Sequence, residues 1–178
     1  MDSYAIAAVR ARNAMLPDVG AIHALIESYA QQGSLLPRTA PELSENVRDF
    51  VVAEADGRFA GCGALHIYGP HLAEVRSIAV LPDAKGRGIG RCLVKALLAD
   101  ARRHEITCVC LFTRVPEFFG KLGFRVAQRA ELPDKIYKDC IACPKLMDCD
   151  EIAMVIGEIP SNTNGMRDPL IPIPLVKI

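Results

Sequence analysis

The segment between Ile78 and Ala101 places the strongest constraint on how this chain can fold. Apolar residues run up to Val80, Pro82 ends the run, and three glycines follow at alternate positions. From Gly90 onward the apolar residues recur every three or four positions, at Leu93, Val94, Leu97, Leu98 and Ala101. This pattern predicts a strand, a tight glycine-rich turn and a long amphipathic helix.

The turn in this segment has the residue types that bind phosphate. Gly86, Gly88 and Gly90 lack a Cβ atom, so their backbone can turn tightly and bring N–H groups close to anion oxygens. Three basic residues, Lys85, Arg87 and Arg91, alternate with these glycines. A glycine-rich connection with solvated basic side chains is the alternative interpretation. The chain has no GxxxxGK[ST] pattern and no GxGxxG in a first strand–helix unit, which argues against a Walker loop and a dinucleotide fold.

The rest of the chain predicts a mixed sheet with helices on its faces. Helices are expected from Val19 to Tyr29 and from Pro41 to Phe50, and a short helix over 116–122. Asp56-Gly57 predicts a hairpin turn. Strands are expected over 7–11, 50–55, 58–67, 74–80, 107–113, 124–127 and 151–157. The fold class is therefore α/β (α+β), with a central sheet of about six to seven strands.

Two local expectations concern the strand over 74–80 and the end of the chain. Glu74, Arg76, Ile78 and Val80 alternate and are expected to share a face, unless a bulge reassigns them. One domain is expected over 1–159, followed by a Pro-rich tail over 160–178. This tail is predicted to be extended and to dock on the surface or on a partner subunit, which suits a homodimer.

Charge and hydropathy limit the partners and the compartment. The chain has 21 Lys and Arg residues against 21 Asp and Glu, so its net charge recruits neither nucleic acid nor an anionic membrane. No apolar run approaches the roughly 18 residues that span a bilayer, and the first residues lack the apolar stretch of a signal peptide. Seven scattered cysteines fit a reducing compartment. We expect a cytoplasmic protein.

Two motifs carry a resemblance to a known superfamily. VLPDAKGRGIGRCLVKALL resembles the acetyl-CoA motif of the GCN5-related N-acetyltransferase (GNAT) superfamily, and FFGKLGF at 118–124 resembles its next motif. The resemblance implies the GNAT fold and acetyl-CoA as co-substrate. It implies that Ile78, Ala79 and Val80 line the pantetheine arm and that Lys85, Gly86, Arg87, Gly88, Ile89, Gly90 and Arg91 bind the pyrophosphate. The resemblance also places Phe119 among the cofactor-binding residues. Phe119 replaces the Tyr that many members use as general acid, so it has no proton to donate.

A narrower resemblance concerns the acceptor. Four stretches resemble the acetyltransferase domain of N-acetylglutamate synthase: AQQGSLLPRTAPELSENVRDF, GCGALHIYGPHLAEVRSIAV, LFTRVPEFFGKLGF and LPDKIYKDCIACPKLMDCDEIAMV. This implies transfer of acetyl to the α-amine of L-glutamate, the first step of arginine biosynthesis, by direct attack in a ternary complex. Glutamate has two carboxylates, and guanidinium groups bind carboxylates bidentately. Candidate acceptor contacts are Arg38, Arg76, Ser77 and Arg114, and Glu74 matches the family's general base. Surface arginines and an exposed strand-end glutamate are the alternative interpretations.

The cysteines permit several interpretations. Cys62, Cys92, Cys108 and Cys110 lie in apolar elements and are expected to be packed thiols rather than nucleophiles. A second group, Cys140, Cys143 and Cys149, forms CxxCxxxxxC, which permits a zinc half-site, a redox pair or reduced structural thiols. A closed zinc site needs four ligands, and no histidine lies nearby to complete it. We predict no metal.

Two further functions remain open at this stage. The first is a GNAT enzyme that acetylates another small amine, such as a polyamine or a xenobiotic. The second is a non-catalytic module that senses acetyl-CoA and signals to a partner. Glu74, Arg38 and Arg114 favour an enzyme, whereas the missing phenol at Phe119 favours the sensing module.

Overall fold

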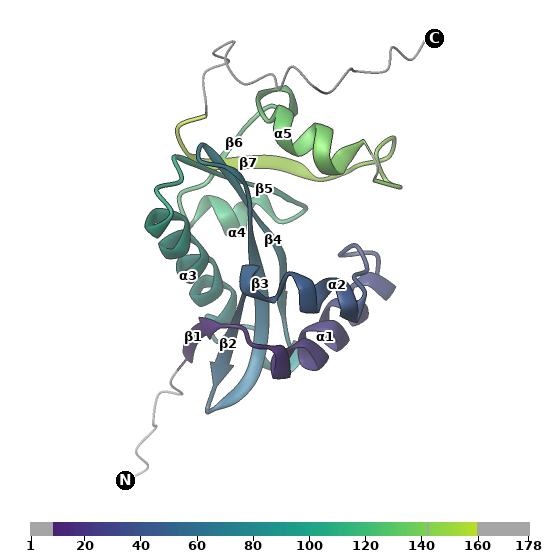
Figure 1. The fold of residues 1–178 in the computed structure, drawn as a ribbon, viewed down its shortest axis with the longest axis vertical. Helices are drawn as coiled ribbons and strands as arrows, with labels where there is room; N and C mark the ends of the chain where they lie inside the picture. Colours follow the sequence, from purple (N-terminus) through teal and green to yellow (C-terminus); the bar gives the residue numbers. More distant parts are fainter. Residues whose placement is uncertain (1–8, 142, 160–178) are drawn as a thin grey trace.

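Seven strands form one mixed sheet in the computed structural model, which describes residues 9–141 and 143–159 (Figure 1). The strand order is β1-β2-β3-β4-β5-β7-β6. Neighbouring strands are antiparallel except β4 and β5, which are parallel. The strands are β1 Val9–Asn13, β2 Phe50–Ala55, β3 Arg58–Gly69, β4 Leu72–Val80, β5 Cys108–Thr113, β6 Arg125–Val126 and β7 Ile152–Gly157. The predicted fold class and mixed sheet are confirmed.

Helices cover both faces of this sheet. Figure 1 shows α3 on one side and α1 and α2 on the other. The helices are α1 Val19–Gln31, α2 Ala40–Glu45, α3 Ile89–Arg103, α4 Pro116–Gly120 and α5 Pro133–Lys135, which continues as the π-helix η5 Ile136–Cys140. Short 3-10 turns are η1 Leu16–Asp18, η2 Val47–Asp49, η3 Pro82–Ala84 and η4 Arg129–Glu131. Within the described residues, no helix has the length and apolar character needed to cross a membrane.

Alternation along β2 builds the two layers of the core. Val51 and Ala53 pack in one buried cluster with Leu93 and Leu97 of α3. Phe50 and Val52, which point the other way, pack in a second cluster with Ile22 and Ile26 of α1. A third cluster joins Leu72, Cys108, Cys110 and Val155 to Leu132, which precedes α5.

A β-bulge in β4 makes one sequence expectation wrong. Cys62 of β3 pairs with Ala79 and Ala64 pairs with Arg76, so the single residue Gly63 stands opposite both Ser77 and Ile78. The extra residue reverses the alternation of side chains. Val75 and Ile78 consequently share the cluster under α3. Glu74 and Arg76 therefore lie on the opposite face from Ile78 and Val80, and the four do not share a face.

Three smaller differences concern the ends of two elements and one helical segment that the sequence did not predict. The helix that was predicted from Pro41 to Phe50 ends at Glu45, and Phe50 begins β2 instead. The first strand runs to Asn13, while residues 7 and 8 lie outside the described residues. The helical segment over 133–140 has no apolar periodicity that predicts it. The tail over 160–178 lies outside the described residues, so its extended form and its docking stay predictions.

Candidate active site

β4 separates from β5 in the middle of the sheet. The two strands pair only between Leu72–Glu74 and Cys108–Cys110, although β4 continues to Val80. The bulge begins just beyond this pairing, where Ser77 has a φ of 54°. A bulge bends its strand, so it accounts for the divergence of β4 from β5. The β4 backbone beyond Glu74 therefore has an edge that β5 does not pair, and a ligand with amide groups can bind there.

The glycine-rich loop ends at the N-terminus of α3. Gly86 and Gly88 have φ values of 80° and 81°, in the region that favours glycine. Gly88 is the N-cap residue, with no side-chain cap and no acidic residue in the first turn. The first-turn N–H groups of a helix have no intrahelical partner, so this end of α3 fits an anion such as a pyrophosphate.

Two of the predicted cofactor-binding cations in this loop already have neighbours. Arg87 forms an exposed ion pair with Asp56 at 2.7 Å. The Lys85 ammonium lies 5.3 Å from the centre of the Tyr29 ring. The Tyr29 hydroxyl in turn donates a hydrogen bond of 2.8 Å to the Val80 carbonyl. Arg91 is exposed on the first turn of α3.

The apolar residues predicted to contact the cofactor lie mostly in the core. Ala79, Ile89 and Phe119 are buried, and Ile78 is partly buried against the α3 cluster. Phe119 packs edge-on against Phe124 with ring centres 5.8 Å apart. These side chains stabilise the core. The β4 residues among them can therefore contact a ligand only through their backbone N–H and C=O groups.

The neighbouring ring of Phe118 was not singled out from the sequence. It is more exposed than Phe119 and lies against Gly90 of α3, where a Cβ atom would stand 3.2 Å from Phe118 Cζ. FFGKLGF contains this residue, so the motif carried the signal. Phe118 thus bounds the N-terminus of α3 from the side of α4.

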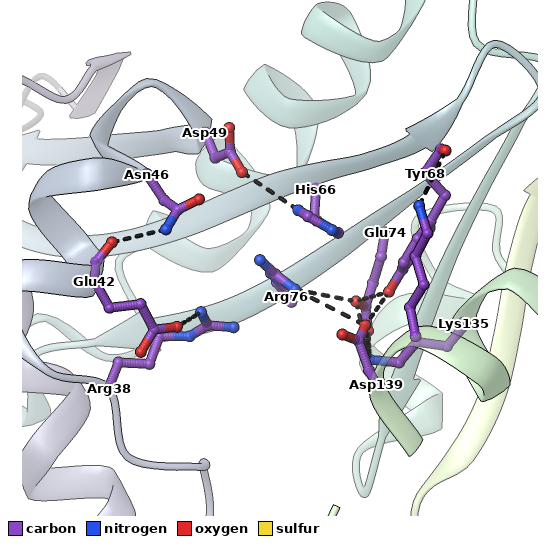
Figure 2. Close-up of polar contacts among 11 residues, drawn as sticks. Arg38, Glu42, Asn46, Asp49, His66, Tyr68, Glu74, Arg76, Lys135 and Asp139 are labelled. Carbon is purple, nitrogen blue, oxygen red and sulfur yellow. Dashed lines mark hydrogen bonds and ion pairs between the residues drawn. The ribbon is translucent and has the colours of Figure 1, made fainter. Parts of the chain in front are cut away.

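Glu74 lies in a cluster of charged and polar side chains from four elements, here called the Glu74 cluster: Tyr68 of β3, Glu74 and Arg76 of β4, Lys135 of α5 and Asp139 of η5 (Figure 2). Glu74 is 3% exposed, so it is not an exposed strand-end glutamate. Lys135 Nζ lies 2.9 Å from Glu74 Oε1 and 3.1 Å from Oε2. The Tyr68 hydroxyl lies 2.8 Å from Oε2.

The cluster balances two carboxylates against two cations. Asp139 contacts Lys135 at 3.1 Å and also hydrogen-bonds the Tyr68 hydroxyl. Arg76 Nη1 lies 4.0 Å from Glu74 and 3.9 Å from Asp139. Burial disfavours the charged forms, but the opposite charges outweigh it: the pKa of Lys135 is raised by Glu74 and Asp139, and the pKa of Asp139 is lowered by Tyr68 and Lys135. Lys135 and Asp139 therefore stay charged at neutral pH.

Arg76 of this cluster and the neighbouring Arg38 bring two positive charges to the site. Their side chains are each 17% exposed, so Arg38 and Arg76 are not ordinary surface arginines. Burial and the charge of Arg76 lower the pKa of Arg38, and Figure 2 draws Arg76 between Arg38 and Glu74. Glu42 pairs with Arg38 at 2.5 Å. Arg76 Nε is buried and has no hydrogen-bond partner in the described part of the chain. An anion beside Arg76 would supply one.

The third predicted arginine lies in a different pocket. Arg114 pairs with Asp150 at 2.7 Å and donates to the Ser34 carbonyl at 3.2 Å. Arg114 and Ser34 line a small pocket together with Leu35, Leu36, Cys143, Lys145, Cys149 and Glu151. The loop that carries Ser34 leads directly to Arg38, so Arg114 is linked to the acceptor side by that loop. Ser77, at the bulge, is partly exposed.

The seven cysteines are free thiols. Burial raises the pKa of Cys62 to about 12 and also raises the pKa of Cys110, which makes both poor nucleophiles. In the C-terminal group, Cys143 N–H donates to the Cys140 carbonyl at 3.0 Å, and Arg129 lies 3.1 Å from Cys149 Sγ. Within residues 9–141 and 143–159, no three His, Cys, Asp or Glu side chains are placed to hold a metal ion.

Comparison with known proteins identifies the family of this chain. The profile of the Acetyltransferase (GNAT) domain family matches residues 46–126. The chain is 42% identical over 144 residues to "Uncharacterized N-acetyltransferase CT2212" of Chlorobaculum tepidum, covering 81% of this chain and 93% of that protein. It is 36% identical over 131 residues to "Amino-acid acetyltransferase" of Mycobacterium tuberculosis, covering 72% of this chain and 75% of that protein.

Two of the similar solved structures are complexes with coenzyme A. Rv2747 from Mycobacterium tuberculosis, in complex with CoA and NLQ, has a TM-score of 0.71 and 31% identity, with 83% of this chain and 98% of that chain covered. N-acetylglutamate synthase from Neisseria gonorrhoeae, complexed with coenzyme A and N-acetyl-glutamate, has a TM-score of 0.77 and 29% identity. The match covers 85% of this chain and 35% of that chain. From the family match, the relatives and the diverging β4, this chain belongs to the GNAT acetyltransferases, and acetyl-CoA is its co-substrate.

Proposed function

We propose that this acetyltransferase acts on the α-amine of L-glutamate, which would place it at the first step of arginine biosynthesis. The observation that carries the proposal is the position of Arg38 and Arg76 beside the buried Glu74 carboxylate, where β4 leaves β5. A relative named "Amino-acid acetyltransferase" supports an amino acid as acceptor. The neighbour complexed with N-acetyl-glutamate supports the dicarboxylate.

The α-carboxylate is assigned to Arg76 and Arg38. In an amino acid the α-amine and the α-carboxylate are bonded to one carbon, so a base that reaches the amine must lie near the cation that binds the carboxylate. Arg76 Nη1 is 4.0 Å from Glu74 Oε2, and its buried Nε has no hydrogen-bond partner among the described residues. A carboxylate bound there would satisfy that nitrogen and the forked geometry of the guanidinium.

The γ-carboxylate is assigned to Arg114. This arginine contacts the loop at Ser34, four residues before Arg38, so it can serve the far end of an acceptor held by Arg38. Its partner Asp150 is largely exposed and would exchange Arg114 for the substrate or share it. We place Ser77, which lies at the bulge where β4 diverges from β5, on the acceptor side as well.

In the proposed reaction Glu74 acts as general base. It removes a proton from the α-ammonium, and the amine nitrogen then attacks the thioester carbonyl carbon in a ternary complex. The C–N bond forms, the C–S bond breaks, and the coenzyme A thiolate leaves and takes up the second proton of the amine nitrogen, directly or through water. The unpaired β4 edge over 78–80 binds the pantetheine arm and offers N–H groups to the developing oxyanion, while the Lys85 to Arg91 loop holds the pyrophosphate.

An acceptor panel tests the proposed function. Purified protein is incubated with acetyl-CoA and millimolar L-glutamate, D-glutamate, L-glutamine or putrescine, and released thiol is measured. L-glutamate is expected to give the highest kcat/KM, since it alone offers both carboxylates in the correct hand. Higher kcat/KM with putrescine would assign another amine, and acetyl-CoA binding without turnover of any acceptor would assign a sensing module.

A further inference from the structure

The Glu74 cluster contains one hydroxyl between two carboxylates. Tyr68 Oη lies 2.8 Å from Glu74 Oε2 and also hydrogen-bonds Asp139 Oδ2 (Figure 2). A phenol has one proton, so it donates to one carboxylate at a time. The contact with the other carboxylate becomes a hydrogen bond when that carboxylate carries a proton. The geometry therefore accommodates one proton beyond that of the phenol.

The two carboxylates differ in their access to water. The Glu74 side chain is 4% exposed, whereas that of Asp139 is 31% exposed. Tyr68 joins them and is itself partly buried. A proton taken up at Glu74 has little direct contact with solvent, and Asp139 is the solvent-facing end of the same hydrogen-bonded chain.

We propose that Tyr68 and Asp139 form a proton relay that carries the acceptor's proton from Glu74 to solvent. The inference rests on the assignment of Glu74 as base in the proposed function. The proton leaves the α-ammonium for Glu74 and passes to the Tyr68 oxygen as the phenol gives its own proton to Asp139. Asp139 then releases that proton to water. No charge is left on Tyr68, whose new proton faces Glu74, and the three groups return to their starting state when this proton rotates back toward Asp139.

The surrounding charges support transfer in this direction. Burial and the two carboxylates raise the pKa of Tyr68, so a free phenolate is disfavoured and the phenol must receive a proton as it gives one. Lys135 contacts both carboxylates, and its charge helps to lower the pKa of Asp139, which favours release of the proton from Asp139. Arg76 faces them from β4, and Lys138 lies 5.4 Å from the centre of the Tyr68 ring.

Variants at the two ends of the relay distinguish proton transfer from a structural role. Tyr68→Phe and Asp139→Ala are expected to lower kcat about tenfold to hundredfold, less than the roughly 10²- to 10⁴-fold that general acid–base catalysis contributes, because Glu74 itself remains. Acetyl-CoA affinity should stay within twofold. Asp139→Ala opens the solvent end, so imidazole or phosphate at fixed pH and ionic strength should restore its kcat. Tyr68→Phe breaks the link to Glu74 and should gain nothing from the same buffers.

Asp134→Asn is the matched control, because Asp134 lies on the same short helix and pairs with His71 at 2.9 Å instead of Glu74. Its kcat should match that of the wild type. Asp139→Asn, which keeps the side-chain size, serves if the alanine variant does not fold. Turnover of Tyr68→Phe within twofold of the wild type, or a slow Asp139→Ala that no buffer rescues, would overturn the relay. Wild-type failure on glutamate would instead reject the acceptor, and the relay would be tested with the best amine of the panel.

Discussion

At the scale of single residues, the chemistry depends on a carboxylate that the fold holds out of water. We predict that Glu74→Gln lowers kcat about 10²- to 10⁴-fold, because an amide cannot accept the amine proton. The dissociation constant of acetyl-CoA should stay nearly unchanged, since the glycine loop is untouched. Stopped assays with L-glutamate and a binding titration measure the two quantities.

Glu54→Gln is the control for this prediction. Glu54 is also buried, but it pairs with Arg10 and Arg12 at the far end of the sheet. This variant should melt at a lower temperature and keep kcat per folded enzyme within twofold. Unchanged turnover in Glu74→Gln would remove Glu74 from the mechanism.

A second prediction at this scale concerns acceptor selectivity. Arg114→Ala should lower kcat/KM for L-glutamate about 10- to 100-fold, as expected for one lost charged hydrogen bond, and should change kcat/KM for L-glutamine much less. Arg103→Ala, exposed at the end of α3, should leave the ratio of the two acceptors as in the wild type. Equal losses for both acceptors would show that Arg114 supports the fold instead of the γ-carboxylate.

Several residues of the cluster were not accessible to sequence reasoning. Glu74 and Arg76 were singled out from the sequence, but Tyr68, Lys135 and Asp139 were not. Their contacts with Glu74 join positions 6 and 61 residues apart, and Tyr68 meets Asp139 across 71 residues. The local signal for the last two is a Lys–Asp pair at i and i+4, which is common on exposed helices. Long-range pairing of this kind has no local sequence pattern.

At the scale of elements, the bulge in β4 sets the geometry of the site. Ser77 has a φ of 54°, where a β-branched residue is disfavoured by about 1–2 kcal/mol. We predict that Ser77→Val lowers the melting temperature and weakens acetyl-CoA binding, because β4 would be drawn back toward regular pairing. Ser77→Gly accepts the same φ and should keep acetyl-CoA affinity. Equal acetyl-CoA affinity in the two variants would contradict this role of the bulge.

The start of α3 allows a second element-scale test with an internal control. Gly88, the N-cap, has a φ of 81°, so Gly88→Ala is expected to cost about 1–2 kcal/mol and to raise the dissociation constant of acetyl-CoA. Gly20 lies in α1 with open space around it and no positive φ, so Gly20→Ala should stabilise the protein by about 0.5 kcal/mol. Thermal melts and a coenzyme A titration distinguish the two. Equal effects would contradict the conformational argument.

Elements with strong local signals were predicted well. Asp56 and Gly57 both have positive φ and form the hairpin between β2 and β3, as their sequence indicated. The apolar run before Thr113 became β5, inside the sheet. The helical segment over 133–140 was missed because its place depends on buried Leu132 and on ion pairs to β4. The face reversal in β4 depends on a bulge whose position no residue pattern fixed.

At the scale of the whole molecule, an ion network fastens the N-terminal edge of the sheet. Arg12 of β1 pairs with Asp18 at 2.8 Å and with Glu54 of β2 at 2.8 Å, and Arg10 pairs with the same Glu54. This network lies at the edge strand β1, which three strands separate from β5 in the sheet. The attachment of β1 to the sheet therefore depends on charges other than those of the Glu74 cluster. The effect of pH on stability can be measured independently of turnover.

Low pH should weaken the ion pairs that attach β1 to β2. Hydrogen bonds from Arg12 lower the pKa of Asp18, and hydrogen bonds from Arg12 and Arg10 lower the pKa of Glu54. A carboxyl whose folded pKa is depressed stabilises the fold above its unfolded pKa, about 4, and this stability is lost as the pH falls through the folded pKa. The melting temperature should therefore decline below about pH 4. Asp18→Asn should lower it at pH 7 and flatten the acid decline, whereas the exposed Glu45→Gln should do neither. A decline of wild-type slope in Asp18→Asn would place the acid sensitivity in carboxylates outside this network.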